Sequence, residues 1–238
     1  MPAMTVARLT LESYFRSGWM WLEFVLVLLC FAALFFPFRV YTAGFYGTSN
    51  LALGAIAILG TAIMVRQATG ARTYLVLSRL SSRASYSRGL MLATALLRVP
   101  LLVLMLGLVL ITGQLIDPAA GPLLIGIIGL LPNCLLLAIL TVALSSPMAT
   151  RLKRIIFLAW LALVLFAQSP LFWLPDTVIS VLRVASVPLL PLIACYNISV
   201  TSTIGLAGAS GLVMEGVYVV VLALIAGYWL ERRDLLLY

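Results

Sequence analysis

The 238-residue chain is 64% hydrophobic and 9% charged, whereas ordinary soluble domains carry about 25% charged residues. This composition excludes a soluble globular domain and indicates a membrane protein. The net charge of +8 does not indicate nucleic-acid binding, because the basic residues are divided among short breaks between long apolar runs. We therefore expect membrane lipid, and no nucleic acid, as a partner.

The first predicted element is an amphipathic helix over residues 5–18. Arg8, Glu12 and Arg16 follow one another at i, i+4 spacing, and apolar residues cover much of the remaining helix surface. Two tryptophans follow, as is typical of a membrane interface. We expect a short helix that lies on the cytoplasmic leaflet and bends into the first span, with a solvated N-terminal tail as the alternative. Because these charges interrupt the first residues, we expect no cleavable secretory signal.

Six apolar runs approach the length of about 20 residues that one helix needs to cross a bilayer core of about 30 Å. They cover residues 20–36, 51–65, 90–116, 122–144, 155–174 and 212–230. We predict an all-α polytopic membrane protein that forms a single transmembrane domain over residues 1–238. Its six transmembrane helices follow the interfacial helix.

The basic residues sort by side in this predicted topology. With the N-terminus inside, the outer loops hold only Arg39 and Arg183. The cytoplasmic segments hold Arg8, Arg16, Arg66, Arg72, Arg79, Arg83, Arg88, Arg151, Lys153, Arg154, Arg232 and Arg233. This positive-inside bias predicts a multi-pass protein of the cell membrane with both termini in the cytoplasm.

The predicted outer connections differ in character. Residues 37–50 predict a short interfacial loop without chemistry. The outer region 175–211 is long, mostly apolar and interrupted by Pro188 and Pro191. We favour a re-entrant hairpin before the last helix, packed against protein neighbours. The alternative is a seventh span, which would place the basic C-terminal tail outside, against the charge rule.

No residue pattern predicts catalysis or a bound cofactor in this chain. The sole lysine, Lys153, is followed by Arg154, so the Gly-Lys-Ser/Thr sequence of a phosphate-binding P-loop is absent. The chain has no histidine, the commonest general base and metal ligand. The cysteines lack the spacing of a disulfide framework or a metal site, and we expect them to be small packing residues: Cys30, Cys134 and Cys195. We expect no catalytic residue and no metal.

Three ionisable residues lie within predicted spans, where a charge is costly and is a candidate for function. Glu23 and Arg98 both lie one or two turns from the cytoplasmic ends of their predicted helices. They could pair, or each could extend separately to the headgroups. Glu215 lies near the outer end of the last span, where it could meet Arg183 or face a polar cavity, and we expect a structural role.

The longest predicted cytoplasmic loop, 66–89, carries a basic segment without acidic residues. If this segment is helical, Arg72, Arg79 and Arg83 lie within about 40° of one another, with Tyr86 close by. Such a stripe indicates a role beyond membrane topology, because a topology signal needs neither a helical stripe nor the tyrosine and glycine that close it. The alternative is a topology signal that rests on anionic lipid.

The basic segment and the order of the elements are similar to those of a known family. The segment runs from an arginine through an apolar stretch and Ser-Arg to a tyrosine and a glycine: Arg72, LVLSRL, Ser82, Arg83, Tyr86 and Gly89. A surface helix before six spans, a re-entrant outer hairpin and a short basic tail complete the pattern. The chain thus resembles the type-2 permeases of ATP-binding-cassette exporters. It departs from them where RQATGAR lacks their acidic residue after the second span and where Leu90 replaces their lysine.

The resemblance implies a permease that forms a homodimer or a heterodimer with a second permease. It also implies that two copies of a separate cytoplasmic ATPase subunit bind ATP and magnesium, so this chain would not be an enzyme by itself. The partner-docking residues would be Arg72, Arg79, Arg83, Tyr86, Arg88 and Gly89. The apolar spans suit export of a hydrophobic or amphipathic substrate. Two other classes stay open: a non-transporting membrane anchor or assembly subunit, and a polytopic membrane enzyme, which the lack of histidine disfavours.

Overall fold

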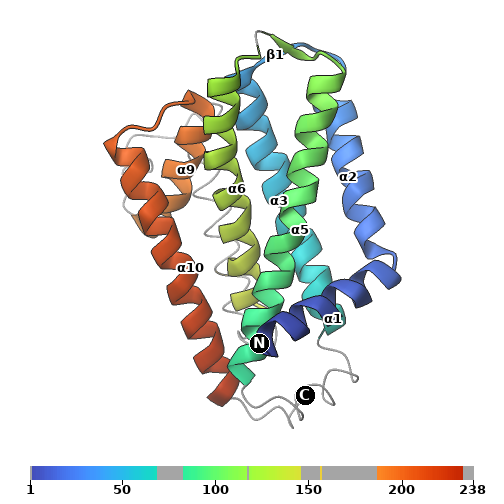
Figure 1. Cartoon of the computed structure of the whole chain (residues 1–238), viewed down its shortest axis with the longest axis vertical. Coiled ribbons are helices and arrows are strands. Elements are labelled where there is room, and N and C mark those ends of the chain that lie inside the picture. The colour runs from blue at the N-terminus through green and yellow to red at the C-terminus, as the bar shows by residue number, and fades with distance from the viewer. Residues whose placement is uncertain (1, 69–82, 117, 146–155, 157–186, 233–238) are drawn as a thin grey trace.

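The computed structural model describes residues 2–68, 83–116, 118–145, 156 and 187–232 (Figure 1). Its helices are α1 (Pro2–Arg16), α2 (Trp19–Leu34), α3 (Thr42–Ala68), α5 (Arg83–Ile111), α6 (Ala120–Ala143), α9 (Leu190–Thr201) and α10 (Leu206–Arg232). A 3-10 turn, Val187–Leu189, precedes α9. Two short strands, β1 (Val40–Tyr41) and β2 (Leu115–Ile116), pair in parallel. Apart from this bridge, the regular structure of the described residues is helical.

Four of the described helices are long and apolar enough to cross a membrane: α3, α5, α6 and α10. The 16-residue α2 meets the same criteria only together with α1, from which it is bent by 72°. These helices confirm the prediction of an all-α membrane protein. The predicted fifth span, 155–174, lies outside the described residues except for Ile156.

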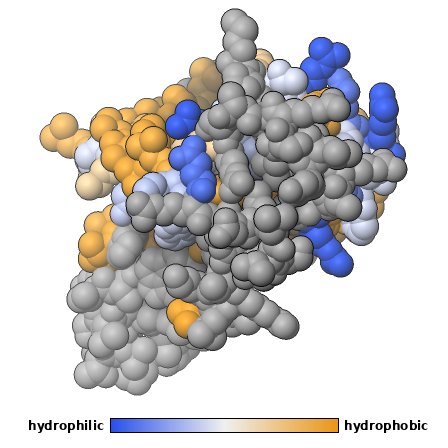
Figure 2. All heavy atoms as spheres, turned by 90° about the horizontal axis from the view of Figure 1, so that it is seen from below, coloured by the Kyte–Doolittle hydropathy of each residue, from blue (hydrophilic) through white to orange (hydrophobic). Residues whose placement is uncertain are grey.

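The two ends of the bundle differ in charge. We call the end that carries α1, where α3 and α10 end and α5 begins, the basal end, and the end that carries β1 and β2 the distal end (Figure 1). Arg8, Arg16, Arg66 and Arg88 are exposed on elements of the basal end, whereas Arg39 is exposed beside β1. Figure 2 looks onto the basal end, where hydrophilic residues lie beside hydrophobic ones. The described arginines are thus distributed as the charge sorting predicts.

The amphipathic spacing near the N-terminus correctly predicts a helix with one buried face. In α1, Val6 and Tyr14 are buried against the bundle. On the exposed side, Arg8 Nε lies 2.8 Å from Glu12 Oε1. Gly18 adopts the left-handed conformation, with φ of 79°, and turns the chain between α1 and α2. Because of this turn, α1 lies across the basal end instead of continuing the line of α2.

The first turns of α5 form the seat of α1. A Cβ added at Gly89 would lie 2.6 Å from Val6 Cβ and 2.8 Å from the backbone oxygen of Ala3, so the contact requires a glycine. Because α5 begins at Arg83, the end of the predicted loop 66–89 is helical. The helix is longer than its apolar run, since packing against α1 compensates for its polar first turns.

The start of α3 corrects the expectation that residues 37–50 form a loop. The helix begins at Thr42, so its first turns include the glycines and polar residues that suggested a connection. Gly47 faces α9, where an added Cβ would lie 3.6 Å from the Tyr196 hydroxyl oxygen. This distance is an ordinary van der Waals contact, so Gly47 packs beside α9. The connection between α2 and α3 is correspondingly short and contains β1.

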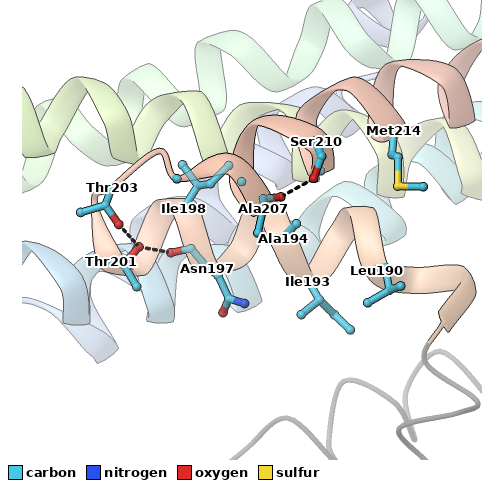
Figure 3. A pocket seen from close by; sticks show the side chains of 13 residues that line it. Leu190, Ile193, Ala194, Asn197, Ile198, Thr201, Thr203, Ala207, Ser210 and Met214 are labelled. Atoms are coloured by element: carbon cyan, nitrogen blue, oxygen red, sulfur yellow. Dashed lines mark hydrogen bonds between the residues drawn. The ribbon is translucent and has the colours of Figure 1, made fainter.

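The short helix α9 packs beside the start of α10. Its 12 residues extend about 18 Å, which is too short to cross a membrane. The chain reverses after α9 at Ser202, whose φ is 52°, and α10 runs back antiparallel to it (Figure 3). Ala194 of α9 lies directly against Gly211 of α10. Residues 175–186 of the predicted re-entrant region lie outside the described residues, so the complete hairpin stays a prediction.

The helices α6 and α9 meet backbone to backbone at Gly129. An added Cβ there would lie 2.5 Å from the Cys195 carbonyl oxygen and 2.6 Å from the Ser199 nitrogen. We predict that Gly129→Ala lowers the free energy of unfolding by about 1 to 3 kcal/mol, the usual cost of overpacking. Gly121→Ala in the same helix, where nothing lies within 4 Å, is the matched control and should be neutral or slightly stabilising. Thermal unfolding in detergent compares the two variants, and equal midpoints would contradict this contact.

Candidate functional site in the buried polar clusters

A buried ion pair joins α2 to α5, and α1 contributes a hydroxyl to it. Arg98 Nη1 lies 2.8 Å from Glu23 Oε2, and the two side chains are 2% and 1% exposed. The Tyr14 hydroxyl donates to Glu23 Oε1 at 2.6 Å. Arg98 Nε donates to the backbone oxygen of Thr94 at 3.2 Å. The two charges therefore pair, and neither extends separately to the headgroups.

The ion pair is enclosed by four helices. On α3, the absence of a side chain at Gly60 leaves room for the Glu23 carboxylate, which an added Cβ would overlap. Burial, followed by the hydrogen bond to Glu23, raises the pKa of Tyr14, so its hydroxyl keeps the proton that it donates. Because α5 begins at Arg83, Arg98 lies roughly 22 Å along the helix, farther from its start than the expected one or two turns. The pair thus fixes α1, α2, α3 and α5 around one point.

A second buried cluster links α3, α6 and α9 through side-chain amides. Asn133 Nδ2 donates to Asn50 Oδ1 at 2.7 Å, and Asn50 Nδ2 donates to Ser199 Oγ at 2.6 Å. Ser199 Oγ donates in turn to the backbone oxygen of Tyr196 at 2.7 Å. Sequence reasoning missed both asparagines as site residues. An isolated amide in or beside an apolar run is a usable signal, because it needs a partner inside the bundle.

The third intramembrane charge, Glu215, is buried on α10 with 2% exposure. The Cys195 thiol of α9 donates a hydrogen bond to Glu215 Oε2. Cys195 therefore does more than fill space, which the sequence did not predict, whereas Cys134 is a buried part of the hydrophobic core. Arg183, the partner considered for Glu215, lies outside the described residues. The contact ties the short helix α9 to the last helix.

The predicted docking residues fall into three groups. Arg72 and Arg79 lie outside the described residues, and Arg83 opens α5 without a described side chain. Arg88 is exposed at the basal end. The remaining two are buried in helix contacts: Gly89 seats α1, and the Tyr86 hydroxyl donates to the backbone oxygen of Ala68 at 2.5 Å. Tyr86 and Gly89 thus join α5 to α3 and α1 instead of forming exposed surface.

We predict that Arg98→Met lowers the free energy of unfolding by about 3 to 5 kcal/mol, because it leaves the Glu23 carboxylate buried without its partner. The double variant Glu23→Gln with Arg98→Met removes both charges and keeps an acceptor for Tyr14, so most of the lost stability should return. Arg39→Met, at an exposed distal position, is the control and should change stability by less than about 0.5 kcal/mol. Unfolding is followed in detergent by circular dichroism. A single variant as stable as the native chain would contradict the enclosed pair.

The described residues include no group of three or more His, Cys, Asp or Glu side chains that could hold a metal ion. The buried charged residues Glu23, Arg98 and Glu215 instead take part in contacts between helices. Comparison of the chain with protein families, with curated proteins and with solved structures finds no match.

Proposed function

We propose that this chain is the membrane-spanning permease subunit of an ATP-binding-cassette transporter. A separate cytoplasmic ATPase subunit powers it, and it exports a hydrophobic or amphipathic substrate. The observation that carries this proposal is the attachment of α1 across the basal end, directly against the start of α5. In the permeases that the chain resembles, a surface helix and the segment before the third span occupy these places in the order of elements.

The contacts at the basal end are suited to transmit movement. The basic segment 72–89 ends in the first turns of α5, so a force on it reaches that helix first. From there, Tyr86 is hydrogen-bonded to the end of α3, and Gly89 lies against α1. Farther along α5, Arg98 is paired with Glu23 of α2. An ATPase that docked on the segment would therefore act on four helices at once.

The positions at which α6 ends and α10 begins are consistent with six spans. The helix α6 ends at the basal end, whereas α10 starts toward the distal end (Figure 1). In this proposal the chain crosses the membrane once more between Ala143 and Leu206. The 12 residues of α9 are too few for this crossing, and the apolar run 155–174 has the required length. In this proposal α9 is the returning arm of the re-entrant hairpin.

The charge distribution favours the cell membrane with the basal end in the cytoplasm. The exposed arginines of α1, α3 and α5 gather at that end, as the positive-inside rule requires. Apolar side chains of α2 and α10 are exposed along much of both helices, for example Leu29 at 59% and Val213 at 69%. In a transporter of this kind, such surfaces contact lipid or the second permease copy.

We predict that the purified chain does not hydrolyse ATP and that its complex with the ATPase subunit does. The physical reason is that the chain lacks the lysine and hydroxyl spacing that cradles phosphate and magnesium. Phosphate release is measured for the chain alone, for the ATPase alone and for the reconstituted complex in lipid. Turnover by the chain alone at the rate of the complex would contradict the proposal.

Replacement of Arg79 and Arg83 by Gln should weaken ATPase binding at least tenfold. Two charge-assisted hydrogen bonds of about 1.5 to 3 kcal/mol each would be lost. Pull-down of the ATPase subunit measures the effect, after correct membrane insertion has been checked. The control, Arg151→Gln with Arg154→Gln, removes the same charge from another predicted cytoplasmic segment and should bind normally. Unchanged binding by the first variant would leave the segment as a topology signal on lipid.

A further inference from the structure

Among the described residues, one buried carboxyl group has no cation to compensate it. The buried acidic and basic side chains of this part of the chain are Glu23, Arg98 and Glu215. Arg98 Nη1 lies 2.8 Å from Glu23 Oε2, so the charges of these two compensate each other. Glu215 lies roughly 14 Å along α10, inside the apolar length of that helix. The pairing of the other two therefore leaves Glu215 without an opposite charge in the described interior.

The groups that contact Glu215 from α9 and from its own helix are uncharged. The Cys195 thiol of α9 donates to Glu215 Oε2, and a thiol is a weak donor. Glu215 Oε1 is buried and has no hydrogen-bond partner among the described residues. The other titratable side chain of α9 is Tyr196, whose hydroxyl lies beside Gly47 of α3. Tyr218, one turn farther along α10, carries no positive charge.

The other described helices that pack along α10 also bring no cation to Glu215. These helices are α6 and α5. The only titratable side chain of α6 is the buried Cys134 thiol. On α5, Arg98 is paired with Glu23 and also donates to the backbone oxygen of Thr94. The remaining titratable residues of α5 lie in its first two turns, at the basal end: Arg83, Tyr86 and Arg88.

These surroundings suit a neutral carboxyl group. An ionised carboxylate that loses its water without gaining a cation is far more costly than the same group with a proton. The cost is largest inside a membrane, where no bulk water can relieve it. Because the thiol donates to Glu215 Oε2, Oε1 is the oxygen left to carry the proton. Glu23 differs in this respect, since Arg98 compensates its charge.

We propose that Glu215 is a proton-binding site: in the membrane its carboxyl group carries a proton on Oε1, and loss of this proton separates α9 from α10. The site is formed by these two helices alone, so it does not depend on the proposed transport function. Ionisation would place an uncompensated negative charge at the junction where Ala194 lies against Gly211. Separation of the helices relieves this charge by admitting water.

The junction already has an opening that water can enter. A groove of about 460 Å³ lies between α9 and α10 and is open to the surface (Figure 3). It extends as far as Met214, the chain neighbour of Glu215. Asn197 of α9 and Ser210 of α10 line the groove and are exposed. A modest outward movement of α9 would therefore bring solvent toward the carboxyl group.

Infrared spectroscopy tests for the proton, because the C=O stretch of a protonated carboxyl group is absent from a carboxylate. The full chain is studied near neutral pH in nanodiscs of ether-linked phosphatidylcholine, which has no ester carbonyl to mask this band. The native chain should show a protonated-carboxyl band that Glu215→Gln lacks. Identical spectra of the two chains in this region would overturn the proposal, because Glu215 would then be ionised and held by a cation such as Arg183.

Glu12→Gln is the matched control, since it makes the same change on the surface of α1. The hydrogen bond from Arg8, followed by the charge of Arg8, lowers the pKa of Glu12, so this residue is ionised and its replacement should leave the band unchanged. If Glu215→Gln fails to insert, the native chain is labelled with carbon-13 at its glutamate carboxyl groups. The label should shift the protonated-carboxyl band, and a band that does not move would count against the site.

Two spin labels test whether the proton holds the junction. They are attached at Asn197→Cys and Ser210→Cys after Cys30 and Cys134 have been replaced by alanine, and the fully buried Cys195 is kept. The same chain without the two introduced cysteines should take up no label. The pH is raised until the protonated-carboxyl band disappears. The distance between the labels should then increase in the chain that keeps Glu215 and stay constant in Glu215→Gln. A constant distance in both chains would contradict the proposed separation.

Discussion

The ion pair between Glu23 and Arg98 determines how the helices at the basal end meet. In a bilayer no water is present to solvate either charge, so each must be compensated inside the protein. Glu23 comes from α2 and Arg98 from α5, while Tyr14 donates from α1 and Gly60 of α3 leaves the required space. Moving any one of these helices would remove a partner of the buried pair or the space that the pair occupies. The same interaction therefore ties α1, α2 and α5 together at one point.

Around α9, close contact between helix backbones holds the helices together, as the ion pair does at the basal end. Without a hydrophobic force between helices in lipid, association depends on van der Waals packing and hydrogen bonds, which small residues allow. Gly129 brings α6 against α9, and Gly211 brings α10 against the same helix. The amides of Asn50 and Asn133 then add hydrogen bonds at the junction. A helix too short to cross the membrane is thereby held within the bundle.

The sequence predicts the all-α membrane class, the amphipathic α1 and the position of α6 well, because these depend on composition and periodicity. It fails where a residue's role depends on a distant neighbour. The glycines near the start of α3 suggested a loop, yet Gly47 is a helix contact with α9. Tyr86 and Gly89 are also buried in helix contacts, which the motif did not predict, whereas their part in docking a partner stays a prediction. The pairing of Glu23 with Arg98 was open from the sequence, since their helices could not be placed side by side.

Placement of the bundle in the membrane with its basal end in the cytoplasm is tested most directly by cysteine labelling in intact cells. The three native cysteines are replaced by alanine, and single cysteines are introduced as Ser13→Cys on α1 and Thr203→Cys in the turn before α10, both exposed positions. A membrane-impermeant maleimide should label Thr203→Cys in intact cells and Ser13→Cys only after permeabilisation. Labelling of Ser13→Cys in intact cells, with protection of Thr203→Cys, would contradict this orientation and the function built on it.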